Sequence, residues 1–276
     1  MKIEDQRVRD KTIKDFGEQF NKFSLFEEDK YWADLDHLKD LLGDTLSFSE
    51  IKDKIIAEIG SGNGRIVNML QDLKPLKTFV VEPSKSFEII KKNNKNNNNI
   101  FYHNVDGANF MFEEKCDFIF SLGVIHHIKN PEDVIQNINS NLNDNGKFLC
   151  SVYAKENNKL LMNLLNILSF TKKIDDKYVF VLSFIFNLIL IPYIFVCKLL
   201  PIRLPMKKYL TERFVKNNFK NRTHIIFDQL NPEYAKFYSK EEILDLIEKN
   251  GFKIEKVFDS AGNNWSVRAI KNNSIK

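Results

Sequence analysis

The sequence has little cysteine and no large excess of charge of either sign. Its three cysteines stand far apart in 276 residues, each within an apolar run, at Cys116, Cys150 and Cys197. This spacing fits neither a disulfide framework nor a zinc site, so we expect buried thiols in a reducing compartment and no metal. Basic residues exceed acidic ones by only 41 to 37. That excess is too small for a protein that follows a phosphate backbone, so we expect no nucleic-acid partner.

The N-terminal stretch MKIEDQRVRDKTIKDF has no apolar run and mixes charges of both signs. It therefore does not have the pattern of a secretory signal. We expect a cytoplasmic chain with no defined protein partner.

Short apolar runs rich in β-branched and aromatic residues alternate with helical patterns between Lys54 and Ala154. The predicted strands are KIIAEIG, KTFVVEP, IFYHNVD, CDFIFSLG and GKFLCSVYA. Such alternation indicates a parallel sheet with helices on both faces. Two more strand-like runs, FKIEKVF and NWSVRAI, stand close enough to form an antiparallel pair. We therefore predict an α/β fold with a Rossmann-like sheet of seven strands, parallel except for an antiparallel C-terminal strand, flanked by helices and carrying an apolar helical insertion.

A glycine-rich loop, AEIGSGNGR, follows the first predicted strand. It is not a P-loop, because Gly64 is followed by Arg65 and Ile66 where that motif needs Lys and Ser or Thr. It is not a dinucleotide fingerprint either, because its spacing is G-x-G-x-G and not G-x-G-x-x-G. Glu58, two residues before Gly60, would repel a phosphate but would suit a cationic ligand such as the ammonium group of an amino acid.

The motif EIGSGNG resembles the first motif of the class I S-adenosylmethionine-dependent methyltransferases. The resemblance implies that Glu58 lies near the ammonium end of S-adenosyl-L-methionine, that Glu82 of VVEP accepts hydrogen bonds from the ribose, and that Asp106 of NVDG meets the adenine amine. The stretch from Cys116 to Val152 resembles the family's fourth strand, His-rich turn and fifth strand. The cofactor-binding residues implied in this way are Glu58, Gly60, Ser61, Gly62, Gly64, Glu82, Pro83, Asp106, Gly107, Ser121, Leu122 and Gly123.

The resemblance divides the chain into four parts. We expect a helical N-terminal cap over 1–50, the cofactor-binding core over 51–155, an apolar helical insertion or lid over 156–230, and a C-terminal helix with the last two strands over 231–276.

The acceptor side is expected from histidines and from a second, narrower resemblance. His127 and His224 are candidate catalytic bases, because imidazole accepts protons near neutral pH. The stretch THIIFDQLNPEY resembles one found in bacterial small-molecule methyltransferases. It implies that Thr223, Asp228 and Tyr234 face the substrate, together with His126; the alternative is that these residues cap the insertion and fasten it to the sheet.

The apolar run over 178–200 is long enough to be a transmembrane candidate. A single crossing would separate the last two strands from the sheet they must join, and Asn187 and Pro192 interrupt the run, which predicts a kinked helix or a helical hairpin. Two alternatives remain, a lid alone or a lid that also makes peripheral membrane contact through 178–208 at the inner face. The flanking basic residues that favour contact are Lys172, Lys173, Lys177, Lys198, Arg203, Lys207 and Lys208.

The function expected from these features is O-methylation of a small molecule, such as a sugar or a surface-glycan precursor. The alternatives are C-methylation of a quinone or lipid, and a membrane-associated module that binds S-adenosylmethionine without catalysis. A nucleic-acid base methylase is disfavoured, because SLGV stands where such enzymes carry an Asn/Asp-Pro-Pro-aromatic motif.

Overall fold

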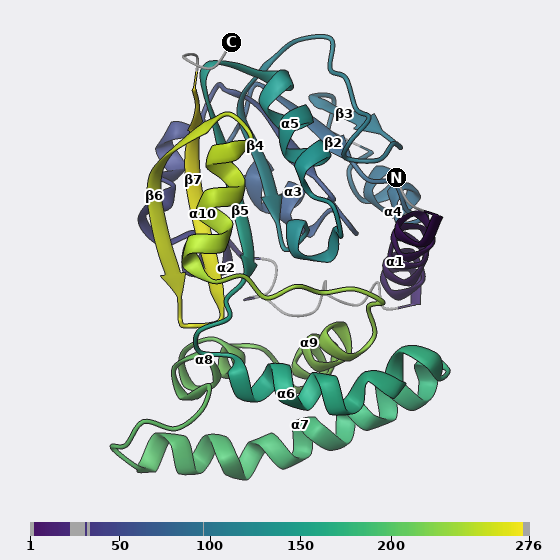
Figure 1. Cartoon of the computed structure of the whole chain (residues 1–276). Helices are drawn as coiled ribbons and strands as arrows, with labels where there is room; N and C mark the ends of the chain where they lie inside the picture. Colours follow the sequence, from purple (N-terminus) through teal and green to yellow (C-terminus); the bar gives the residue numbers. More distant parts are fainter. Residues whose placement is uncertain (1–2, 23–30, 32–33, 96, 273–276) are drawn as a thin grey trace.

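A seven-stranded sheet forms the centre of the computed structural model, which describes residues 3–22, 31, 34–95 and 97–272 (Figure 1). The strand order is β3-β2-β1-β4-β5-β7-β6. β7 runs antiparallel to both of its neighbours, and the other strands are mutually parallel. The predicted α/β fold is therefore confirmed. The strands are β1 (Ile55–Ile59), β2 (Lys77–Val81), β3 (Ile100–His103), β4 (Cys116–Leu122), β5 (Leu142–Tyr153), β6 (Phe252–Ser260) and β7 (Asn264–Lys271).

Helices cover both faces of the sheet, because successive side chains of a buried strand point to opposite sides. In β4, Ile119 faces the core under α5 (Glu132–Asn141) and α10 (Lys240–Lys249). Its neighbours Phe118 and Phe120 face α2 (Leu35–Leu42) and α3 (Arg65–Gln71). The helix α4 (Phe87–Asn93) packs beside α3 on this second face. The three cysteines are free and buried, as predicted.

The N-terminal segment is fastened to β7 by an ion pair. Arg268 donates to both carboxylate oxygens of Glu50, each at 2.8 Å, and also to Glu255 at 2.8 Å. The hydrogen bonds from Arg268 lower the pKa of the Glu50 carboxyl to about 2. These hydrogen bonds hold the short helix Phe48–Glu50 against β7.

The insertion forms a separate helical layer at the carboxyl ends of the parallel strands (Figure 1). It consists of α6 (Lys159–Ile167), α7 (Asp176–Leu199), α8 (Lys207–Glu212) and α9 (Phe219–Leu230). Val179, Ile194 and Phe227 are among the buried side chains of its own small core. The remaining long helix, α1 (Ile3–Lys22), lies at one side of the sheet near α4.

Of the two forms expected for the apolar run, a kinked helix or a helical hairpin, the hairpin is wrong, because α7 is one continuous helix. The amide of Asn187 does not break it, since the side chain donates to the Phe219 carbonyl at 2.8 Å and to the Thr223 hydroxyl at 2.9 Å on α9. Pro192 removes one hydrogen bond from the helix, and the turns beyond it are held by buried Ile194. By length and composition α7 could cross a membrane.

Candidate active site

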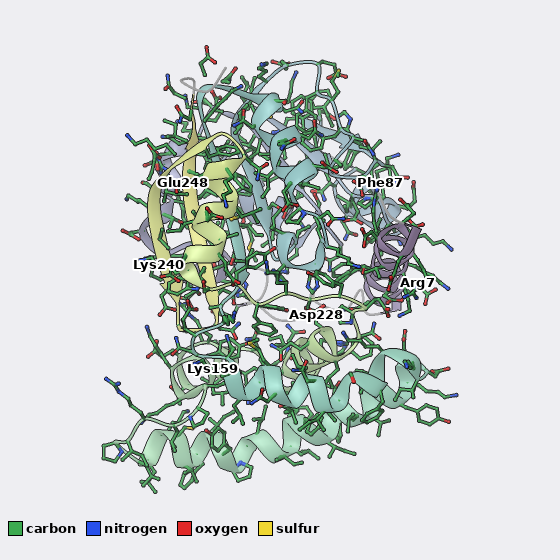
Figure 2. The ribbon with its side chains drawn as sticks, viewed as in Figure 1. Arg7, Phe87, Lys159, Asp228, Lys240 and Glu248 are labelled. Carbon is green, nitrogen blue, oxygen red and sulfur yellow. The ribbon has the colours of Figure 1, made fainter. Side chains whose placement is uncertain are left out.

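A cavity of about 380 Å³ lies at the carboxyl ends of the central parallel strands. This is the edge at which open α/β sheets bind ligands. Side chains from the sheet loops, from α1 and from α9 line it together. Asp228 of α9 lies between the sheet and the helical layer (Figure 2).

The glycine loop approaches the cavity with its backbone. Gly60 has a φ of 77°, and a Cβ there would stand 2.6 Å from both methyl carbons of Val124. Gly62 has a φ of 57°, and its Cβ would stand 2.9 Å from the ring of Phe20. Its N–H donates to a carboxylate oxygen of Glu82 at 2.8 Å. Both positions require glycine, and the loop is tied to the end of β2.

Glu58 is an almost completely buried carboxyl group at the cavity wall, with 1% of its surface exposed. Its Oε2 has no hydrogen-bond partner in the part of the chain that the structure describes. Burial raises the pKa of Glu58 to about 8, and the nearby positive charge of Arg65 limits that rise. A buried carboxyl with an unused oxygen is suited to a cationic ligand group.

The helix α1 covers the side of the cavity that contains Asp106. Arg9 donates to Oδ2 of Asp106 through its Nε at 2.9 Å and its Nη2 at 2.7 Å. The other carboxylate oxygen of Asp106 accepts from the Ala108 N–H at 2.8 Å. Two residues further along α1, Lys11 pairs with Glu233 at 3.0 Å. These contacts attach α1 to both the sheet and the segment after α9.

The ring of His127 is held in one orientation. Its Nδ1 lies 2.9 Å from the carbonyl oxygen of Tyr234, and because a carbonyl can only accept, the neutral ring carries its proton on Nδ1 and its lone pair on Nε2. The Phe16 ring packs edge-on with centroids 4.7 Å apart. Burial lowers the pKa of His127, and the charge of Asp228 opposes this shift. A neutral imidazole with a free lone pair can act as a proton acceptor.

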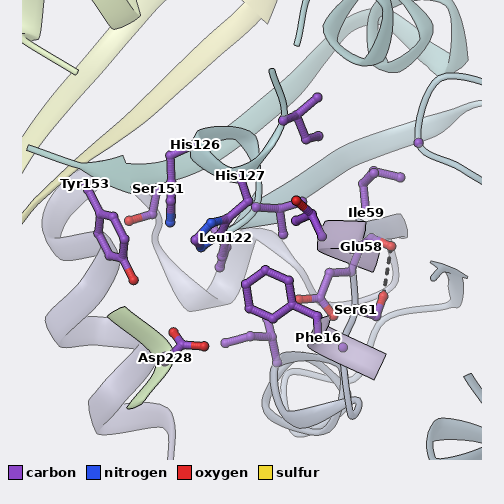
Figure 3. Close-up of a pocket in the computed structure, with 18 of the residues that line it drawn as sticks. Phe16, Glu58, Ile59, Ser61, Leu122, His126, His127, Ser151, Tyr153 and Asp228 are labelled. Atoms are coloured by element: carbon purple, nitrogen blue, oxygen red, sulfur yellow. Dashed lines mark hydrogen bonds between the residues drawn. The ribbon is translucent and has the colours of Figure 1, made fainter. Parts of the chain in front are cut away.

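His126 and Asp228 both lie near this imidazole (Figure 3), and the ring centroid of His126 is 4.2 Å from that of His127. Asp228 accepts a hydrogen bond from Gln19 of α1 at 2.8 Å, and burial raises the pKa of its carboxyl. Within the described residues, neither ring nitrogen of His126 has a hydrogen-bond partner, although only 1% of the residue is exposed. Its ring centroid is 3.9 Å from that of Tyr153, whose side chain points toward Asp228. A bound ligand is the natural partner for such a buried polar ring.

A family model described as a methyltransferase domain matches residues 31–257. The chain belongs to this family. The tRNA U34 carboxymethyltransferases of Aliarcobacter butzleri and Campylobacter jejuni (strain 81-176) are similar to this methyltransferase, with 30% and 29% identity. The matches cover 38% and 41% of this chain but only 36% and 40% of those proteins.

Solved structures support the same fold. Human N-acetylserotonin methyltransferase superposes with a TM-score of 0.52 and 12% identity, over 85% of this chain and 51% of that one. A SAM-dependent methyltransferase of Aquifex aeolicus superposes with a TM-score of 0.50 and 11% identity, over 84% and 92% of the two chains. Identities this low carry information on the fold alone.

The methyltransferase uses S-adenosylmethionine, the cofactor that its motifs imply. The cavity fits this molecule in two respects. The unused oxygen of buried Glu58 would meet the ammonium group. Glu82 has two carboxylate oxygens, each accepting one backbone N–H, and its remaining lone pairs can accept from ribose hydroxyls.

Most of the residues expected from the sequence line one cavity. They are Glu58, Gly60, Ser61, Gly62, Glu82, Pro83, Asp106, Gly107, Leu122, Gly123, His126, His127, His224 and Asp228. Burial lowers the pKa of His224 to about 4, so its imidazole is neutral at pH 7.

Four expected residues do not line the cavity. Gly64 begins α3 with a φ of 85°, and Ser121 lies inside β4, where its hydroxyl donates to the Ile59 carbonyl. Thr223 accepts from Asn187 and so joins α9 to α7 within the insertion. The side chain of Tyr234 does not line the cavity, but its backbone carbonyl contacts Nδ1 of His127 and so orients that ring.

Sequence reasoning missed several cavity residues outside the motifs. On α1, Val8, Thr12, Phe16 and Phe20 line the cavity, and Gln19 reaches it beside them. Their four-residue spacing puts them on one helical face, which is a signal that the sequence contains. Arg65, Tyr153, Tyr209 and Arg213 also line the cavity, and no local pattern distinguishes them.

Proposed function

We propose that this methyltransferase transfers a methyl group to a hydroxyl oxygen of a polar small molecule, such as a sugar or a phosphate-bearing precursor of a surface glycan. The observation that carries the proposal is the buried imidazole of His127, whose Nδ1 lies 2.9 Å from the Tyr234 carbonyl oxygen, which leaves Nε2 as the nitrogen of the neutral ring that can accept a proton. When bound, S-adenosylmethionine supplies a methyl carbon already activated by the positive sulfur, so the residues mainly align the acceptor and receive its proton.

In this proposal one half of the cavity binds the cofactor and the other half binds the methyl acceptor. Glu58 binds the ammonium group, Glu82 the ribose and Asp106 the adenine amine of the cofactor. On the acceptor side, His127 takes the hydroxyl proton at Nε2. The negative charge of Asp228 stabilises the resulting imidazolium, because it favours the protonated ring.

Four polar side chains of the lining favour a polar acceptor over a quinone. Arg65 and Arg213 bring positive charge to the cavity, and Asn263 and Asn264 bring amides. Burial lowers the pKa of Arg65 only to about 10, so it remains charged at neutral pH. These charged and amide groups would lose their bound water without gaining a hydrogen bond if an apolar ring packed against them. They can instead bind hydroxyl and phosphate oxygens.

A second candidate acceptor is a tRNA base, because the curated relatives are named tRNA U34 carboxymethyltransferases. Their similarity spans about two fifths of their own length. The chain has only a small basic excess, 41 to 37, which favours the small molecule.

Labelled S-adenosylmethionine added to cell extract with the protein separates these acceptors. Mass spectrometry should find the label in polar small molecules or glycan precursors. Label confined to RNA would establish the second candidate, label in quinones would establish the lipid alternative, and binding without any transfer would establish a non-catalytic module.

His127→Asn tests the proposed base. Asparagine keeps a donor toward the Tyr234 carbonyl but has no counterpart of Nε2, so kcat should fall roughly 10²–10⁴-fold with little change in cofactor affinity. His103→Asn is the matched control, because His103 stands at the end of β3 and does not line the cavity. Equal activity in both variants would exclude His127 as the base.

A further inference from the structure

The helical layer presents a broad apolar surface to solvent. Along α6 and α7, large apolar side chains remain exposed on the side away from the sheet; Ile167, Tyr178, Val181, Ile189, Phe195 and Leu199 are each between 55% and 74% exposed. We call this surface the outer face. Figure 2 shows side chains of α7 projecting away from the body of the molecule. Water-exposed helices normally place polar residues there, so this surface requires a partner.

In the apolar middle of α7, the polar residues Ser183 and Asn187 point inward. Ser183 and Asn187 are completely buried, and both lie on the stripe that packs toward α9. The Ser183 hydroxyl donates to the Val179 carbonyl at 2.7 Å, and Asn187 donates to α9. The helix therefore has the reverse of the arrangement of a surface helix in water. That reversal suits an apolar medium outside and a protein contact inside.

Positive charge borders the outer face. Residues 159–208 contain eight basic and only two acidic side chains. Lys173 precedes α7, Lys177 lies in its first turn, Lys198 lies in its last turn, and Lys208 lies in α8. All four are exposed. Basic residues around an apolar helix face are the pattern that binds anionic headgroups.

A transmembrane position for α7 conflicts with its packing. The helix lies along α9, to which Asn187 attaches it, and α9 carries His224 and Asp228 into the cavity. A crossing would draw the cavity wall into the bilayer. Only an orientation parallel to the membrane plane leaves the sheet and cavity in water.

We propose that the outer face docks α7 flat on an anionic bilayer surface, with its apolar side chains at the depth of the headgroups and the flanking lysines on the phosphates. This proposal stands whichever acceptor is methylated. A second copy of the chain is the competing occupant of the outer face.

Flotation with vesicles tests the proposal. The full chain should float with phosphatidylcholine vesicles that contain phosphatidylglycerol, float much less with phosphatidylcholine alone, and lose only part of its binding at high salt. The double variant Val181→Glu/Ile189→Glu should remain unbound. Its control is Leu76→Glu/Met111→Glu, which changes two exposed apolar residues outside the insertion and should float like the unchanged chain.

Charge is tested by Lys177→Glu and Lys198→Glu, each of which should weaken partitioning by roughly fivefold or more. Unchanged cofactor affinity in each variant would show that it is folded. The proposal is overturned if the unchanged chain does not float or if both double variants float equally. It is also overturned if sedimentation without vesicles shows a dimer that Val181→Glu/Ile189→Glu dissociates, or if the bound chain resists alkaline carbonate and is released only by detergent.

Discussion

Glu58 should lose its proton when S-adenosylmethionine binds. Burial raises the pKa of Glu58 to about 8, so at pH 7 about nine tenths of the free protein carries the protonated acid. A cofactor ammonium group beside the carboxyl favours the ionised form. Binding at pH 7 should therefore release about 0.9 proton per site.

The same linkage fixes the direction of the pH dependence. The ionised fraction of a group with a pKa near 8 increases about ninefold from pH 6 to pH 7, so cofactor affinity should rise about ninefold over that interval. The cofactor's own ammonium stays protonated there and does not contribute.

Calorimetric titration at pH 7, in two buffers of different ionisation enthalpy, measures the proton count directly. Glu58→Gln should abolish the release and the pH dependence and weaken binding by about 1–3 kcal/mol. Glu88→Gln is the control, because the Glu88 side chain is 77% exposed and outside the cavity. Affinity that is constant between pH 6 and pH 7, with no proton released, would refute the placement of Glu58 at the ammonium group.

Three further outcomes are expected. Arg9→Ala removes the ion pair on Asp106 and should speed cofactor dissociation in stopped-flow by up to about fivefold; an unchanged rate would show that α1 does not retain the cofactor. Gly60→Ala should lower the free energy of unfolding by about 1–2 kcal/mol or more, because φ is positive and Val124 blocks the new Cβ, and Val124→Ala in the same chain should restore part of the loss in thermal melts. Glu50→Gln should cost about 1 kcal/mol in urea unfolding at pH 7, after allowance for solvent screening. Since the pKa of Glu50 is depressed, its contribution exists above pH 4.5 and should vanish as the pH falls through about 2.

The sheet and the part of the cavity that we propose for the cofactor were predictable because their signals are local. Glu58, Glu82 and Asp106 each stand at the carboxyl end of a recognisable strand, and parallel strands bring those ends together whatever the helices do. The glycine spacing of the loop also predicts positions that only glycine can occupy, and Gly60 and Gly62 both have a positive φ with no space for a Cβ.

The acceptor half was less predictable because it is built from distant segments. Gln19 and Asp228 form a hydrogen bond although they are 209 positions apart in the sequence. The periodicity of a sequence does not predict contacts between such distant residues. Tyr234 and Thr223 were expected to face the substrate. In the structure the carbonyl of Tyr234 contacts the His127 ring, and the hydroxyl of Thr223 accepts a hydrogen bond from Asn187. For α7, Pro192 suggested an interruption that tertiary packing of the following turns overrides.

The position of β7 has a consequence for synthesis of the chain. β5 is complete at residue 153, yet its outer edge pairs with β7, which ends at residue 271. At ribosomal speeds this edge would wait roughly 6–24 s for its partner. During that interval the nascent chain exposes an open row of backbone donors and acceptors together with the apolar α7, and both features promote aggregation. If another surface covered the apolar face of α7 early, the incomplete chain would expose less apolar surface until β7 is synthesised and pairs with β5.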